Sequence, residues 1–573
     1  MKRLLKYLAD YKKESVLAPL FKLLEALLDL LVPVVVAAII DQGINGSGGT
    51  PAVVRYCLLL AGLAAVGLAA SITAQYFAAK AATGFAKQVR GALFRKIDTF
   101  SYSDLDSLGA PTLLTRMTND VNQLQNGVNM VLRLFLRSPF IVFGAMIMAF
   151  TIDVKSALVF AAVIPVLAAV IFAIILVTIP KYKQVQEGVD GVLAATRENL
   201  SGTRVIRAFR IEQTEIDGFD RKNRALTRLQ LFAGRISALM NPVTYVIINA
   251  AIIALIYVGA LRVDAGVLTQ GAVIGLYNYM SQVLVELIKL ANLIITMTKA
   301  LASANRVADL LDRPSTETTL PENDVQTQAK VLFDHVTLTY RGAGEASLSD
   351  VCLSVPAGQT VGVIGGTGSG KTSLVNLIPR FYDVTKGCVK IGGTDVRKLD
   401  AETLRKNIGI VPQRAALFKG TIRSNLLWGK EDATDEELWE ALKTAQAEKV
   451  ALDKGGLDAD VEQEGRNFSG GQRQRLTVAR ALVRKPKILI LDDSASALDL
   501  KTDAALREAI SKLCYKPTVF IVSQRAAAVM NAQLIVVLDE GAVVGMGTHD
   551  ELMKSCPAYE EIYSSQFKKE ADR

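Results

Sequence analysis

The sequence predicts a multidomain chain in which an all-α transmembrane domain of six helices is followed by an α/β domain of the P-loop type. Three observations predict this fold class. Six long apolar runs lie within the first 295 residues, and the mean hydropathy falls sharply after Arg306. A glycine-rich loop at 365–372 then separates a predicted strand from a predicted helix. We therefore expect a transmembrane domain at 1–310, a linker at 311–328 and an α/β domain at 329–573.

The composition excludes several classes of protein. Hydrophobic residues make up 50% of the 573 residues before the 42 glycines are counted, which is more than in a typical soluble protein. A chain so apolar, with only 16 prolines, is not a disordered protein. Its five cysteines show no CxxC or metal-ligand spacing. We therefore exclude a disulfide-stabilised secreted fold and expect reduced, buried thiols.

Six apolar runs are long enough, or nearly so, to cross a bilayer as helices. They lie at Ser15–Ile40, Arg55–Ala79, Ser138–Ile152, Ala157–Ile179, Ser237–Ala260 and Gly271–Ile295. The third run is short, but it can be extended inward through Val131–Leu136, with Arg133 and Arg137 near the cytoplasmic boundary. The lipid bilayer is therefore the first partner that the sequence implies.

The distribution of cations among the loops orients these spans. The first 13 residues and the segments after the second and fourth spans are rich in Lys and Arg, whereas the alternate loops carry at most one cation each. Because cytoplasmic loops carry the excess of cations, we expect both termini and the α/β domain in the cytoplasm. The net charge of +9 follows largely from this bias, so no nucleic-acid partner is expected.

Two of the inward segments are too long to be simple turns. The segments 80–137 and 180–236 have helical patterning. We expect them to extend the membrane helices beyond the bilayer, with bends near 102–111 and 209–215.

A predicted phosphate-binding loop lies in the first part of the α/β domain. Val361–Gly365 is a predicted strand, and the GGTGSGKT sequence that follows matches GxxxxGK[ST] between a strand and a helix, as the motif requires. In this motif backbone amides surround phosphates, Lys371 reaches the β- and γ-phosphate oxygens, and the Thr372 hydroxyl binds Mg²⁺. The candidate ATP-binding residues here are Gly365, Gly366, Thr367, Gly368, Ser369, Gly370, Lys371, Thr372 and Ser373.

A second motif supplies a carboxylate, and a third indicates the family. Ile488–Asp492 is a buried strand that ends in a carboxylate suited to Mg²⁺. Before it lies the sequence FSGGQ, and with this signature the second half of the chain resembles the nucleotide-binding domain of an ABC transporter. In that family, the residues at Ser469, Gly470, Gly471 and Gln472 meet the γ-phosphate of ATP on a neighbouring subunit, so the resemblance implies a dimer. The six preceding spans resemble the exporter branch of the family.

The resemblance assigns roles to further residues. Tyr340 is where the family places an aromatic ring that stacks on adenine, although a tyrosine at a sheet edge is an alternative reading. Gln413 resembles the glutamine that contacts Mg²⁺ or the attacking water, Asp499 ends the segment SALD that resembles the D-loop, and Glu462–Arg466 resembles a stretch that touches the partner's intracellular loops. The implied cofactors are ATP and Mg²⁺, with Thr372, Gln413 and Asp492 as metal contacts.

Two positions depart from the family pattern, and in the family both lie at the γ-phosphate of ATP. After the Mg²⁺-binding aspartate the family has a glutamate that acts as base toward water, whereas this chain has Asp493, one methylene shorter. Where the family has a histidine, this chain has Gln524, which forms hydrogen bonds but carries no positive charge. His335 and His549 lie elsewhere and are interpreted as structural. The catalytic candidates are Asp493, Gln524 and Gln413.

These departures, beside an intact phosphate loop and signature, indicate a site that binds ATP and hydrolyses it slowly. The combination is similar to one half of the heterodimeric bacterial multidrug ABC exporters, in which one composite site is degenerate. We therefore expect a second, different half-transporter chain as partner, with Ser469–Gln472 completing its competent site. The alternatives are a slow homodimeric exporter or lipid flippase, and a nucleotide-gated regulatory subunit.

The resemblance implies ATP-driven export of an amphipathic small molecule across the plasma (inner) membrane by alternating access, and the sequence leaves open whether this is a drug, a lipid or a peptide. Charged residues within the spans bear on this choice. They are Lys22, Glu25 and Asp29 in the first span, and Glu286 and Lys289 in the sixth. They form ion pairs in one reading; in the other, Glu25, Asp29 or Glu286 lines a cavity that favours cationic amphiphiles.

Overall fold

The computed structural model describes residues 2–314 and 330–571, and the chain divides into two compact units. The first unit comprises residues 1–97 and 111–313, and the second comprises residues 98–110 and 314–573. Most of the expected linker at 311–328 lies outside the described residues. The short segment 98–110 belongs by its contacts to the second unit, although it interrupts the first in the sequence.

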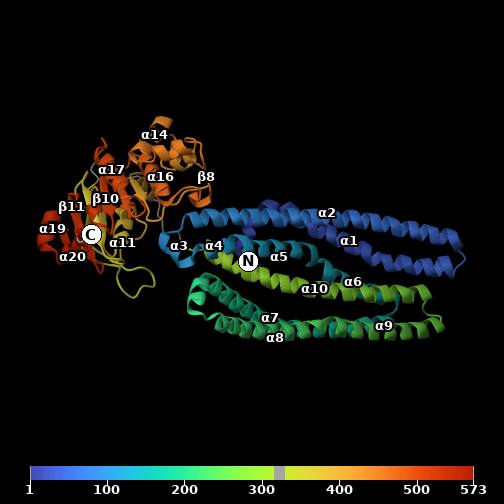
Figure 1. Ribbon diagram of the computed structural model, residues 1–573. Coiled ribbons are helices and arrows are strands. Elements are labelled where there is room, and N and C mark those ends of the chain that lie inside the picture. The colour runs from blue at the N-terminus through green and yellow to red at the C-terminus, as the bar shows by residue number, and fades with distance from the viewer. Residues whose placement is uncertain (1, 315–329, 572–573) are drawn as a thin grey trace. The chain divides into compact units, whose positions relative to one another are not determined.

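The first unit is entirely helical, and its long helices run side by side (Figure 1). The α-helices of this unit, long and short, are α1 (Lys12–Ala38), α2 (Gly49–Asp98), α4 (Ala110–Thr115), α5 (Val121–Leu134), α6 (Arg137–Ile152), α7 (Val154–Phe209), α8 (Glu212–Ala238), α9 (Met240–Asp264) and α10 (Gln270–Leu311). Among the described residues, six continuous helical segments are long and apolar enough to span a membrane. They are Arg3–Ile44, Gly49–Asp98, Ala110–Ile152, Val154–Phe209, Glu212–Asp264 and Gln270–Leu311, so the prediction of six spans is confirmed.

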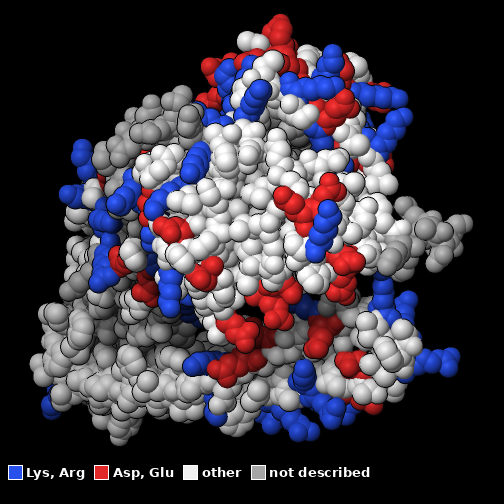
Figure 2. All heavy atoms as spheres, turned by 90° about the vertical axis from the view of Figure 1, so that its left-hand side faces the viewer, with Lys and Arg blue, Asp and Glu red and all other residues white. Residues whose placement is uncertain are grey.

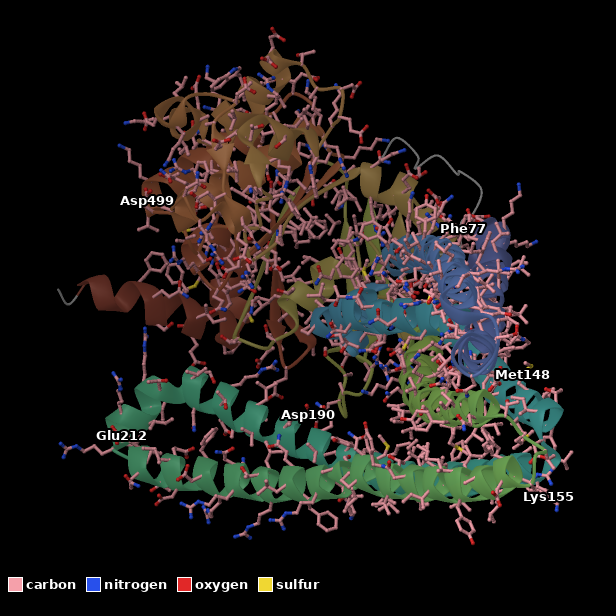
Figure 3. All side chains as sticks on the ribbon, turned by 90° about the vertical axis from the view of Figure 1, so that its right-hand side faces the viewer. Phe77, Met148, Lys155, Asp190, Glu212 and Asp499 are labelled. Atoms are coloured by element: carbon pink, nitrogen blue, oxygen red, sulfur yellow. The ribbon has the colours of Figure 1, made fainter. Side chains whose placement is uncertain are left out.

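The two expected bends lie where helices end. The first is a separate short helix, α3 (Tyr102–Leu108), which Ser101 caps by accepting a hydrogen bond from the Asp104 amide and which Gly109 ends with a φ of 72°. The second bend follows α7, where Arg210 adopts a left-handed conformation with a φ of 54° before α8 begins. Figure 3 labels Lys155, near the start of α7, and Glu212, the first residue of α8 after this bend.

The surface of the first unit is suited to lipid. Large apolar side chains are well exposed along its helices, including Leu58 at 68%, Leu176 at 69% and Ile253 at 69%. A water-soluble protein rarely exposes so many over a contiguous surface. The interior face of α2 is instead lined by small residues, among them Ala74, Ala78, Ala81, Ala82 and Gly84, which allow neighbouring backbones to approach closely.

The second unit contains the predicted α/β domain. Its central sheet has the order β12-β11-β3-β10-β9-β6. The strands are β3 (Thr360–Gly365), β6 (Ile408–Val411), β9 (Ile488–Asp492), β10 (Thr518–Val522), β11 (Leu534–Asp539) and β12 (Ala542–Gly547), and only the β11–β12 pair is antiparallel. The four central strands are almost wholly buried, which explains their continuous apolar runs.

An antiparallel sheet of order β2-β1-β4-β5 lies in the same unit. Its strands are β1 (Val331–Leu338), β2 (Leu348–Val355), β4 (Lys386–Ile391) and β5 (Thr394–Asp395), and β7 (Gly420–Thr421) pairs with β8 (Asp460–Val461) separately. The helices are α11 (Lys371–Asn376), α12 (Ala401–Lys406), α13 (Ile422–Leu427), α14 (Asp435–Thr444), α15 (Glu448–Lys454), α16 (Gly470–Val483), α17 (Leu500–Ser511), α18 (Ala526–Val529), α19 (His549–Ser555) and α20 (Pro557–Ala571).

The expectation of buried thiols is wrong for most of the cysteines. Only Cys556 is buried; Cys388 is half-buried, and Cys57, Cys352 and Cys514 are exposed. Cys352 occupies an outward position of β2, a strand with one face in the core and the other in solvent. Composition alone does not distinguish the two faces of such a strand.

Charges of both signs share the surface of the molecule. On the face shown in Figure 2, Lys and Arg side chains lie among Asp and Glu side chains. In the second unit several cations are paired directly, for example Arg423 with Asp458 at 2.8 Å and Lys430 with Glu437 at 2.7 Å. The excess of positive charge is therefore not gathered into one basic patch on this face.

Candidate nucleotide-binding site

The candidate site lies at the carboxyl ends of four adjacent parallel strands. In the central sheet β3, β10, β9 and β6 are neighbours, and the pairing of Val522 with both Val363 and Asp492 aligns three of their ends. Ligands bind at this edge of open α/β sheets, because the loops that follow parallel strands meet there. The predicted phosphate loop follows β3, and Gln524 follows β10. Asp492 ends β9 and Asp493 follows it, and Gln413 follows β6.

The phosphate loop depends on glycine at Gly370. This residue has a φ of 93°, and a side chain there would bring its Cβ within 2.6 Å of the Ser347 carbonyl oxygen. Gly368 also has a positive φ, of 84°. The loop therefore keeps a conformation in which backbone N–H groups can surround an anion, and α11 begins directly after it at Lys371.

Lys371 is buried among the oxygen atoms of this loop. Its Nζ donates to the carbonyl oxygens of Gly365 at 3.1 Å and Gly366 at 2.5 Å, and to the Ser369 hydroxyl at 3.3 Å. Burial lowers the pKa of the Lys371 ammonium group, and Asp493 and Asp492 oppose that shift. A buried ammonium group held only by neutral oxygens fits a phosphate group, which would supply the missing negative charge.

Thr372 and Asp492 bring two suitable Mg²⁺ contacts together. The Thr372 hydroxyl donates to Oδ1 of Asp492 at 3.1 Å, across 120 residues of sequence. Burial raises the pKa of the Asp492 carboxyl group, and the Thr372 hydrogen bond opposes the shift. A hydroxyl and a carboxylate are the oxygen donors that Mg²⁺ uses beside nucleotide phosphates, so the pair fits this ion.

Both departures from the family pattern line the same cavity. It has a volume of about 250 Å³ and is lined by Ser347, Thr367, Gly368, Gly370, Lys371, Thr372, Ser373, Gln413, Asp492, Asp493, Val522, Ser523 and Gln524. Asp493 has a φ of 47°, its amide donates to the Val522 carbonyl oxygen at 2.9 Å, and its Oδ2 lies 3.5 Å from Nε2 of Gln413. The structure therefore brings together Asp493, Gln524 and Gln413, although they are distant in sequence.

Other predicted residues lie outside this cavity. Ser469 caps α16 through a reciprocal pair of hydrogen bonds with Gln472, so the signature forms a helix N-terminus. Within the described part of the chain, none of Ser469, Gly470, Gly471 and Gln472 lines the cavity. Asp499 caps α17 by accepting a hydrogen bond from the Thr502 amide.

Tyr340 is placed beside the phosphate loop. Its hydroxyl donates to the Ser373 hydroxyl at 2.9 Å, and its ring meets that of Tyr382 edge-on with centroids 4.9 Å apart. Tyr340 lies two residues after the end of β1. This position suits the predicted contact with adenine.

Sequence reasoning missed contacts made by α3, which belongs to the second unit. The Tyr102 ring stacks on Phe381 with centroids 4.2 Å apart, and the Tyr382 hydroxyl donates to Asp106 at 2.6 Å. Burial, aided by this hydrogen bond, raises the pKa of Tyr382, so its phenol stays protonated. The adjacent aromatic residues Phe381 and Tyr382, a few residues after the end of α11, were the available signal.

The charged residues of the spans form a network centred on Arg137. This guanidinium group donates to Glu286 of α10 at 2.6 Å and to Asp29 of α1 at 2.9 Å. Glu286 is 3% exposed and also accepts from Ser138 at 2.7 Å and Lys289 at 2.8 Å. The ion-pair reading of these residues is therefore the one that the structure supports. The sequence did not identify Arg137 as their partner.

Two family models and several known proteins match this chain. The model described as the ABC transporter transmembrane region matches residues 15–287, and the one described as ABC transporter matches residues 348–496. An uncharacterized ABC transporter ATP-binding protein of Mycobacterium tuberculosis is 37% identical over 568 residues, covering 98% of this chain and 97% of the relative.

More distant relatives carry names that describe substrates. A Bacillus subtilis protein named for multidrug export is 31% identical, with 99% of each chain covered. An ATP-dependent lipid A-core flippase of Desulfotalea psychrophila is 32% identical, with 83% of each chain covered. The solved structure of a bacterial Atm1-family ABC exporter with ATP bound superposes with a TM-score of 0.81 over 98% of this chain and 99% of that chain; at 22% identity it shows a common fold. The chain therefore belongs to the ABC transporter family, as an exporter-type half-transporter with its membrane domain and ATPase domain on one polypeptide.

Proposed function

We propose that this protein is one half of a heterodimeric ABC exporter and that its own nucleotide motifs form the slowly hydrolysing site. The partner is a second, different half-transporter chain. The cargo is an amphipathic small molecule, and the relatives named for multidrug export and lipid A-core flipping support drug-like and lipid cargoes. The membrane is the plasma (inner) membrane, with both termini and the ATPase domain in the cytoplasm.

The observation that carries this proposal is the joint presence of Asp493 and Gln524 in the cavity that holds Lys371 and Thr372. Lys371, Thr372 and Asp492 keep the groups that bind phosphate and Mg²⁺. Asp493 has a shorter reach than the glutamate of the family, and Gln524 is neutral. Because general-base catalysis contributes about 10²- to 10⁴-fold, a misplaced base leaves binding intact and slows hydrolysis.

Dimerisation is supported by the location of the signature. Ser469–Gln472 form a helix N-terminus that lies outside the cavity of the same chain, so they are available to ATP bound on another subunit. The bend between α7 and α8 also exposes Phe209 at 73% and Ile216 at 53%. We assign this apolar tip, together with Glu462–Arg466, to contacts with the partner.

We further propose the roles of the remaining residues. Gly365–Ser373 surround the phosphates, Tyr340 contacts adenine, and Thr372, Asp492 and Gln413 hold Mg²⁺. Binding of two ATP molecules draws the ATPase domains together, and the intracellular ends of the helices at 1–310 transmit this closure to the membrane.

The experiment compares two variants in the complex purified with its native partner. Ser469→Arg in this chain blocks the composite site that hydrolyses ATP, and should lower turnover by about 10²-fold or more, as loss of preorganised donors does. Asp493→Asn alters only the slow site. We expect the Ser469 variant to lose far more activity than the Asp493 variant.

The same purification tests the subunit composition. A complex of this chain with a different half-transporter, together with the asymmetry above, supports the proposal. A complex of two copies in which both substitutions abolish hydrolysis contradicts it and favours the slow homodimer. Hydrolysis that drives no ATP-dependent uptake of a fluorescent amphiphile or labelled lipid into inside-out vesicles favours the regulatory subunit.

A further inference from the structure

The antiparallel sheet of the second unit carries a cluster of metal-ligating side chains on its outer face. The cluster consists of His335 on β1 and Asp350 and Cys352 on β2, whose potential ligand atoms all lie within 4.8 Å of one another. Nδ1 of His335 lies 2.8 Å from Oδ1 of Asp350. Both side chains are more than 70% exposed, and Cys352 is exposed as well. These residues lie apart from the nucleotide cavity, whose lining includes none of them.

Two irregularities in the strand pairing bring these side chains together. Phe333 pairs with Leu353 and Val336 with Val351, so Asp334 and His335 together face the single residue Cys352. A bulge of this kind reverses the alternation of side chains. Without it His335 would share the buried face of Phe333; with it Val336 enters the core and His335 points outward.

The second irregularity acts in the same way on β2. Val351 pairs with Val336 and Leu348 with Leu338, so Ser349 and Asp350 together face one residue of β1. Regular alternation would place Asp350 on the buried face of Leu348, whereas the bulge places it outward beside Cys352. His335 and Asp350 adopt left-handed conformations, with φ values of 49° and 48°, at these two bulges.

We propose that His335, Asp350 and Cys352 form a solvent-accessible binding site for a divalent transition metal of the Zn²⁺ class. Imidazole nitrogen, carboxylate oxygen and thiolate sulfur are the donors that Zn²⁺ accepts. Ligand bonds of about 2.0–2.3 Å place two donors of a tetrahedral site roughly 3.3–3.7 Å apart. The exposed side chains reach that arrangement by small rotations, and the fourth position is left to water.

The neighbouring polar residues define the limits of the site. Asp334 has partners other than the cluster. Its carboxylate accepts hydrogen bonds from the Lys390 ammonium group at 3.1 Å and from the Cys388 thiol at 3.7 Å. Among the residues that the structure describes, the grouped metal-ligating side chains are therefore those of His335, Asp350 and Cys352. Because they come from two strands, no short sequence motif reveals them.

The test uses the full-length protein in detergent, freed of metal by a chelator and kept reduced with a phosphine. Co²⁺ alone is titrated as a spectroscopic probe, and Zn²⁺ is then added to displace it. We expect a thiolate-to-cobalt charge-transfer band that saturates at one equivalent. The band should be absent in Cys352→Ser and unchanged in Cys514→Ser, which removes another exposed thiol.

Two further variants distinguish a built site from a lone thiol. Asn tolerates the left-handed conformation, so His335→Asn and Asp350→Asn keep both bulges while removing a ligand. Each should weaken Co²⁺ and Zn²⁺ binding by at least about tenfold, with unchanged thermal unfolding in the absence of metal. Absence of the band in the unaltered protein, its persistence in Cys352→Ser, or unchanged affinity in both Asn variants would overturn the proposal.

Discussion

Gln566 of the C-terminal helix α20 holds the segment that contains Gln524. Its Nε2 donates to the Gln524 carbonyl oxygen at 2.8 Å, and its Oε1 accepts from the Ala526 amide at 2.9 Å. Gln524 lines the nucleotide cavity, and Ala526 is completely buried. One side chain of α20 therefore fixes the backbone on both sides of Arg525, beside the cavity that Gln524 lines.

Replacing Gln566 with Ala should destabilise the protein. The variant leaves the buried Ala526 N–H without its acceptor, which costs about 1–3 kcal/mol. We expect a lower thermal unfolding temperature of the ATPase domain without nucleotide. Ser565→Ala is the matched control, because the Ser565 hydroxyl donates to the Ile562 carbonyl oxygen of the same helix at 2.9 Å. Equal unfolding temperatures for the two variants would contradict this role of Gln566.

Two glycines of the phosphate loop should respond differently to alanine. Gly370→Ala combines a φ of 93° with a Cβ 2.6 Å from the Ser347 carbonyl oxygen, so it should destabilise the nucleotide-free protein by about 1–3 kcal/mol or more. A Cβ at Gly366 would meet no atom of the described residues within 4 Å, and the φ of Gly366 is not positive. Gly366→Ala should therefore change stability by no more than about 0.5 kcal/mol. Thermal unfolding without ATP measures both, and similar losses in the two variants would contradict the steric argument.

The sequence best predicted those parts of the structure in which consecutive residues determine the local geometry. The phosphate loop around Lys371 and the strand ending at Asp492 were located correctly, because strand, loop and helix follow one another in the chain. The length of the apolar runs likewise predicted the six spans. Partners brought together by tertiary packing were not predictable in this way.

Contacts between residues far apart in the sequence depend on helix packing and on strand register. Arg137 and Glu286 are 149 residues apart, and their contact depends on how α6 packs on α10. The His335 cluster depends on two bulges that reverse the side-chain alternation of β1 and β2, and register is not encoded in spacing alone.

Arg137 should matter more for stability than Lys289. Removal of Arg137 leaves Glu286, which is 3% exposed, with its charge only partly compensated, and breaking a buried pair typically costs about 3–5 kcal/mol. We expect Arg137→Met to lower the unfolding temperature in lipid nanodiscs strongly. Lys289 is a matched control, because its side chain is 40% exposed and Glu286 keeps Arg137 in Lys289→Met. If the two variants unfold at the same temperature, the ion-pair reading is wrong.

Tyr382 should control the local stability of α3. Its hydroxyl donates to the Asp106 carboxylate at 2.6 Å, and hydrogen bonds to charged groups contribute about 1.5–3 kcal/mol. Tyr382→Phe removes this bond but keeps the ring that packs against Tyr340. Amide hydrogen exchange at 102–108 should therefore become roughly ten- to hundredfold faster, since exchange reports local opening. Asp106→Asn keeps an acceptor oxygen and should have a smaller effect, and amides of α19 serve as an internal reference. Unchanged exchange at 102–108 in Tyr382→Phe would show that the stacking of Tyr102 on Phe381 holds α3 by itself.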